Sequence, residues 1–169
     1  MSNKVLLKRL KEMASELGDN VPDLNRGGCG IAALAIHKHL SAHVDCELVV
    51  INGNGPVDID KLLETKPALL NESSGYRWCR SGVDFHHIAV TAKIGGTRYI
   101  IDSDGVVPHR TYARDKKEQG LAVCKGTIPI PTLKKLVDHV SNWNPTYSRK
   151  KTPTVKKIVK THFKQLTTA

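Results

Sequence analysis

Two strand-like segments joined by a Gly-Gly pair limit the fold of this chain more than any other feature. Residues 85–94 alternate in polarity, Gly95 and Gly96 follow, and residues 97–102 return with the same period. Alternation on both sides of a two-residue glycine turn predicts an antiparallel hairpin. A loop of two residues pairs residue 94 with residue 97 and determines every earlier pair. The hairpin therefore assigns each side chain to one face of a sheet.

This register predicts a histidine–carboxylate pair. Asp102 falls opposite Ala89 and diagonally next to His87, on the same face of the hairpin. Diagonal neighbours lie about 7–8 Å apart at the backbone, so an imidazole and a carboxylate there can meet. A change of one residue in loop length would place His86 on that face instead. We favour His87 because the two-residue turn is the preferred one. The opposite face is expected to face the core and carries Ile88, Val90, Ala92, Ile94, Tyr99 and Ile101.

Cys29 is the leading candidate for chemistry. It stands in the segment Asn25–Gly30, NRGGCG, directly before the helix-favouring run IAALAI. A thiol in the first turn of a helix meets unpaired backbone N–H groups and the positive end of the helix dipole. Both favour the thiolate, which is the reactive form. Cysteine is also among the most buried residue types, so Cys29 alone would indicate a core residue.

Cys29, His87 and Asp102 together supply the three side chains that thiol catalysis needs. A nucleophilic thiol requires an imidazole to hold its proton, and the imidazole requires an acceptor that orients the ring. The backbone N–H of Cys29 is one candidate oxyanion donor, and Asn25 is the nearest side-chain candidate. We therefore predict a Cys29–His87–Asp102 site, with His86 as the alternative base.

These motifs resemble the papain-like thiol superfamily over roughly residues 25–105. A Gly-Gly-Cys-Gly segment precedes an alanine-rich helix, a histidine begins one strand, and an aspartate ends the next. The order is most similar to transglutaminase-like, bacteriocin-processing-peptidase-like and arylamine-acetyltransferase-like members. The resemblance implies a papain-like core with Cys29 as nucleophile, His87 (or His86) as base and acid, and Asp102 as the orienting residue. It also implies acyl transfer. Cleavage of a peptide or isopeptide bond is the first choice for the reaction, and transfer to an amine is the second choice.

The remaining periodicities predict an α+β protein with a nucleophile-bearing helix packed on a small antiparallel sheet. Helical spacing is expected over 5–17, 29–43, 58–63 and 132–142, and strands over 46–51 and 121–130. We assign residues 1–145 to the catalytic domain, with an N-terminal amphipathic helix. Residues 146–169 form a basic linker and a C-terminal amphipathic helix. The irregular segment 64–83, with Glu72, Tyr76, Arg77 and Trp78, is a candidate wall of the cleft.

Positive charge is concentrated at the C-terminal end of the sequence. The chain has a formal net charge of +10, and residues 139–169 hold seven Lys or Arg residues, all between 149 and 164, and no Asp or Glu. Such a helix either docks its apolar stripe on the domain or binds a polyanion. A non-catalytic protein that binds nucleic acid or an acidic partner through residues 149–164 is therefore the alternative function.

The cysteines favour a cytoplasmic enzyme without a metal or cofactor. Cys29, Cys46, Cys79 and Cys124 are widely spaced and form no CxxC pair. That spacing is unlike a disulfide framework or a regular zinc site. A zinc site of Cys46, Cys79, Cys124 and a histidine is the alternative. No signal peptide or transmembrane segment is expected, and the substrate would be a peptide, a protein or a small acyl compound.

Overall fold

The predicted hairpin lies at the centre of an antiparallel sheet. The computed structural model describes residues 2–53, 55–65, 85–143 and 148–167. Within these residues five strands run in the order β4-β3-β2-β1-β5. Their bounds are β1 Cys46–Asn52, β2 Phe85–Ile94, β3 Thr97–Ile101, β4 Val106–Pro108 and β5 Ala122–Val123. Helices cover the sheet, which confirms the α+β class.

The register of the hairpin is the predicted one. Ile94 pairs with Thr97, and the pairing continues without a shift to Val90 and Ile101. Both turn glycines have positive φ, 58° at Gly95 and 84° at Gly96. A two-residue turn of this kind needs that backbone conformation, which glycine adopts without a steric penalty.

An irregularity in the sheet falls beside the histidine pair. Along β1 and β2, Ile51 pairs with His87, whereas the next residue, Asn52, pairs with Phe85. His86 is thus an extra residue on β2, which is the arrangement of a β-bulge. His86 is exposed, whereas His87 is buried. Bulges often lie next to active sites because they change the direction of neighbouring side chains.

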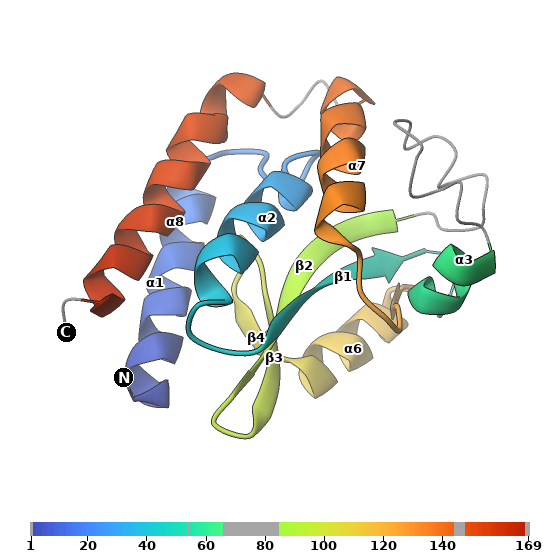
Figure 1. The fold of residues 1–169 in the computed structure, drawn as a ribbon, viewed down its shortest axis with the longest axis horizontal. Helices are drawn as coiled ribbons and strands as arrows, with labels where there is room; N and C mark the ends of the chain where they lie inside the picture. The colour runs from blue at the N-terminus through green and yellow to red at the C-terminus, as the bar shows by residue number, and fades with distance from the viewer. Residues whose placement is uncertain (1, 54, 66–84, 144–147, 168–169) are drawn as a thin grey trace.

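Four helices lie on one side of the sheet (Figure 1). They are α1 Asn3–Asn20, α2 Cys29–Leu40, α7 Ile130–Trp143 and α8 Thr152–Thr167; α1 and α2 contact strands, whereas α7 and α8 pack against helices. α2 is the central one, because it contacts β1, β2, α7 and α8. Most of its residues are buried, as expected for a helix that is apolar on nearly all sides. The core face of the hairpin, including Ile88, Val90 and Ile101, packs in this layer.

The other face of the sheet carries a smaller apolar cluster. Val49, Ile51, Ala89 and Ile100 form it, and Tyr112 packs against them. Tyr112 belongs to α6, His109–Glu118, an element that the sequence patterns did not predict. The described part of the chain also includes α3 at Ile59–Thr65 and the short 3-10 helix η1 at Arg149–Lys151.

The C-terminal helix is part of the main core. The apolar stripe of α8 is buried against α1 and α2 and consists of Val155, Ile158, Val159, Phe163 and Leu166. His162 Nε2 also lies 2.7 Å from Glu16 Oε2 of α1. The apolar stripe of this helix is therefore docked on the domain, and binding of a polyanion through residues 149–164 stays a prediction. Among the described helices, none has both the length and the apolar composition that spanning a bilayer requires.

Several predicted boundaries differ from the structure. The first helix continues beyond Gly18 to Asn20, and α2 ends at Leu40 rather than at residue 43. The strand expected over 121–130 is reduced to Ala122–Val123: Gly126, with a φ of 79°, interrupts the extended backbone, and α7 already begins at Ile130. The candidate cleft wall, with Glu72, Tyr76, Arg77 and Trp78, lies outside the described residues.

Candidate active site

Cys29 is the first residue of α2, as predicted. The preceding residue, Gly28, caps the helix without any side-chain hydrogen bond. In the described part of the chain, no backbone carbonyl accepts a hydrogen bond from the N–H of Cys29 or Gly30. Gly27 has a φ of 110°, a conformation that glycine adopts easily and that turns the chain into the helix. The start of α2 therefore leaves backbone donors beside a thiol that is 8% exposed.

Gly30 allows α7 to approach the nucleophile-bearing helix. A Cβ atom at this position would lie 2.5 Å from Cγ2 of Val137 and 3.6 Å from Cδ1 of Leu133, both on α7. Valine has one strongly preferred side-chain conformation in a helix, so it cannot rotate away without strain. The α2–α7 contact thus requires glycine directly after Cys29.

We expect Gly30→Ala to lower the free energy of unfolding by about 1–3 kcal/mol, the usual range for overpacking a core. Gly18→Ala is the matched control. Its added Cβ would lie 3.5 Å from the nearest atom, the Ser103 carbonyl oxygen, in ordinary contact. Because Gly18 lies inside α1, alanine there should be neutral or stabilising. Urea unfolding of both variants tests this, and equal stability changes would contradict the close-packing argument.

His87 and Asp102 form the pair that the register predicted. His87 Nε2 lies 3.0 Å from Asp102 Oδ2, and the two side chains are 10% and 8% exposed. The second carboxylate oxygen, Oδ1, accepts from the backbone N–H of Asp104 at 2.9 Å and of Gly105 at 3.1 Å. Both oxygens of Asp102 are thus engaged, so the carboxylate is held in one orientation toward the imidazole.

Cys29 is the other side chain that acts on His87, through both a hydrogen bond and its charge. Burial by itself would lower the pKa of His87. Hydrogen bonds to Asp102 and Cys29, together with their negative charges, outweigh it and raise that pKa to about 10. The ring therefore carries a proton at neutral pH, where it can stabilise a thiolate.

Asn25 ties the cysteine loop to the aspartate loop. Its Oδ1 accepts from Ser103 Oγ at 2.6 Å, and its Nδ2 donates to Asp104. These bonds join the segment before Cys29 to the residues after Asp102. The structure thus assigns Asn25 a positioning contact, and its role as an oxyanion donor stays a prediction.

A pocket of about 310 Å³ opens beside His87. It is lined by Asn25, His86, His87, Asp104, Val107, Tyr112, Asp115, Lys116 and Gln119. Burial raises the pKa of Tyr112, and the negative charges of Asp102, Asp104 and Cys29 raise it further. Tyr112 therefore keeps its proton and places a hydrogen-bond donor in the pocket beside His87.

The structure brings the three predicted residues together and adds Tyr112 to the lining of the pocket. Asp102 pairs with His87, whereas His86 lines the pocket and has no hydrogen bond to Asp102 among the described residues. Tyr112 was not predicted because the segment His109–Glu118 has no apolar stripe, and Tyr112 itself is only half-buried. The available signal was its run of helix-favouring residues after Pro108.

The other described cysteines differ from Cys29 in their surroundings. Burial raises the pKa of Cys46 to about 11, and the charges of Asp45 and Glu47 add to the shift. Burial likewise raises the pKa of Cys124, which a hydrogen bond from the backbone at Val57 partly offsets. Both are free thiols in surroundings that disfavour a thiolate. Cys79 lies outside the described residues, so the three-cysteine zinc alternative stays a prediction.

Comparison of the chain with known protein families, with curated proteins and with solved structures finds no match.

Proposed function

We propose that this protein is a thiol-dependent acyl-transfer enzyme with a papain-like core. Cys29 is the nucleophile, His87 the base and acid, and Asp102 the residue that orients His87. One observation carries the proposal: the buried His87 side chain is acted on both by Cys29 and by a carboxylate that is itself held at both oxygens. A merely structural core does not need a thiol and a carboxylate on the same imidazole.

The first half of the reaction forms a thioester. The Cys29 thiolate attacks the carbonyl carbon of the substrate, a C–S bond forms, and the carbonyl π electrons move to oxygen. The N–H groups at the start of α2 stabilise this oxyanion. When the intermediate collapses, the bond to the leaving group breaks and His87 donates its proton to that group. The leaving amine or alcohol departs neutral, and the acyl group stays on sulfur.

The second half returns the thiolate. His87, now neutral, takes a proton from an incoming water or amine as that nucleophile attacks the thioester carbon. The C–S bond breaks and the acid or the new amide is released. Hydrolysis of a peptide or isopeptide bond is our first assignment, and transfer to an amine is the second. The pocket beside His87 would receive the substrate, with Tyr112 as a donor to it.

Acylation by p-nitrophenyl acetate tests the proposal without knowledge of the natural substrate. We expect a burst of one equivalent of nitrophenolate per protein molecule and an acetyl group on Cys29 by peptide mass spectrometry. Cys46 and Cys124 are internal controls, because their raised pKa values keep them as thiols at neutral pH. Acetylation of Cys29, Cys46 and Cys124 at equal rates would instead favour the alternative of a non-catalytic binding protein.

A further inference from the structure

A second, larger concavity lies between α2, α7 and α8, apart from the pocket beside His87. Its volume is about 1120 Å³. The floor of this groove is apolar and consists of Ile31, Leu34, Ala35, Ile130 and Val137. Three of these residues follow one another on α2 at the spacing of a single helix face. Ile130 is 39% exposed, which is unusual for a large apolar side chain.

The rim of the groove is cationic on all three helices. Lys38 extends from α2, Lys134 from α7, and Lys156 and Lys160 from α8, and the described residues that line the groove include no carboxylate. For these four lysines, the described residues supply no ion-pair partner. Cations converging on one groove without counter-charges favour an anionic occupant.

The positive charges of two of these lysines act on His39 of α2. The pKa of His39 is lowered by burial first, and then by the positive charges of Lys38 and Lys160. The ring of His39 stacks on Phe163 of α8, with 5.7 Å between centroids. α2 and α8 are thus held together by this contact while their lysines face the same space.

We infer that this groove docks an acidic amphipathic helix of a partner protein. Such a helix would lay apolar side chains on the floor and direct its carboxylates to the lysine rim. Single-stranded nucleic acid fits less well, because no Trp, Tyr or Phe on which bases could stack is among the described residues that line the groove. The inference does not depend on acyl transfer, since none of the residues assigned to that reaction lines the groove.

The test uses the full chain and a synthetic helical peptide of about 15 residues, with leucines at helical spacing and glutamates elsewhere. A peptide of the same composition with scrambled leucines and a single-stranded RNA of similar length are the comparison probes. We expect the amphipathic peptide to bind several-fold more tightly than either probe at physiological salt, measured by fluorescence anisotropy. Equal binding of both peptides, or tighter binding of RNA, would overturn the inference.

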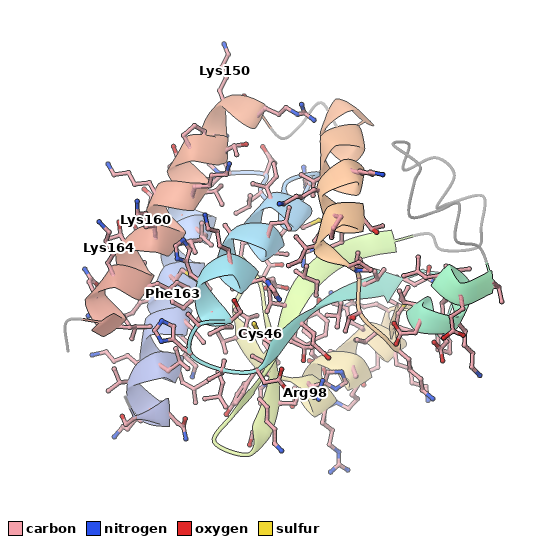
Figure 2. The ribbon with its side chains drawn as sticks, viewed as in Figure 1. Cys46, Arg98, Lys150, Lys160, Phe163 and Lys164 are labelled. Atoms are coloured by element: carbon pink, nitrogen blue, oxygen red, sulfur yellow. The ribbon has the colours of Figure 1, made fainter. Side chains whose placement is uncertain are left out.

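Charge-reversal substitutions test whether the amphipathic peptide binds at the lysine rim of the groove. Lys156→Glu with Lys160→Glu should weaken binding of the amphipathic peptide about tenfold or more, because two favourable charge contacts become repulsive. Lys150→Glu with Lys157→Glu is the matched control, since it makes the same change in net charge at two exposed lysines outside the groove lining. Lys150 points away from the body of the molecule (Figure 2). Equal weakening by both pairs would show a general charge effect and overturn the assignment.

The floor is tested separately by Ile130→Ser. Because Ile130 is partly exposed, we expect this variant to fold normally, as thermal unfolding will show. The substitution should weaken binding of the amphipathic peptide several-fold and leave binding of the scrambled peptide unchanged. Unchanged affinity for the amphipathic peptide in this folded variant would also contradict the inference.

Discussion

Replacing Cys29 by alanine is expected to lower kcat/KM for ester or peptide substrates by at least about 10³-fold. The substitution removes the only atom that can form the acyl-enzyme bond, so the whole covalent route is lost. Stability should change little, because the thiol is small and the substitution deletes a single heavy atom at the start of a helix. We expect a loss of no more than about 1 kcal/mol in the free energy of unfolding. Steady-state kinetics and urea unfolding measure the two effects.

Cys46→Ala is the matched control for this substitution. Cys46 is a free, half-buried thiol at the start of β1, and it is no part of the candidate site. We expect its kcat/KM to stay within about twofold of the original value, as for substitutions remote from a reacting centre. Acyl transfer that survives in folded Cys29→Ala would refute the assignment of the nucleophile.

The hairpin was predictable because its signals are local. Alternating side chains determine the two faces, and Gly95-Gly96 determine the loop length. From these follow the pairing of Ile94 with Thr97 and the approach of His87 to Asp102. Each step involves residues within one short segment. The alternating side chains and the glycine turn also agree on the same hairpin.

The approach of Cys29 to His87 could not be derived in the same way. It depends on how α2 packs on β2, which is a contact between elements far apart in sequence. The hydrogen bonds of Asn25 to the loop after Asp102 depend on that packing as well. Periodicity predicts that Cys29 begins a helix, but it does not say which strand end that helix will meet.

The C-terminal helix α8 also shows what sequence patterns cannot predict about packing. Its apolar stripe, including Val155 and Phe163, was recognised from spacing alone, and it is buried. The spacing did not show that the stripe lies against both α1 and α2. It also did not show that lysines of α8 share a groove with those of α2 and α7. Charge counted along a sequence locates a basic segment, whereas a cationic groove arises only from packing.

Asp102→Asn is expected to reduce kcat/KM by about 10²- to 10⁴-fold while leaving the shape of the site intact. The asparagine Oδ1 can still accept from the backbone N–H groups of Asp104 and Gly105. Its amide then donates toward His87 Nε2, which must become an acceptor. The remaining proton moves to Nδ1, so His87 is held as a neutral ring in the wrong tautomer. The variant thus loses the imidazolium that stabilises the thiolate.

The pH dependence distinguishes this mechanism from simple damage to the fold. In the original protein His87 keeps its proton up to about pH 10, so kcat/KM should fall only as the pH rises through that value. The charge and hydrogen bond of Asp102 raise the pKa of His87, and burial opposes them. Removing this charge and this hydrogen bond must therefore move the basic limb of the pH profile of kcat/KM to lower pH. Asp23→Asn makes the same chemical change at an exposed position and should leave the limb in place. A variant with reduced kcat/KM but an unmoved basic limb would show that Asp102 supports the fold rather than the charge on His87.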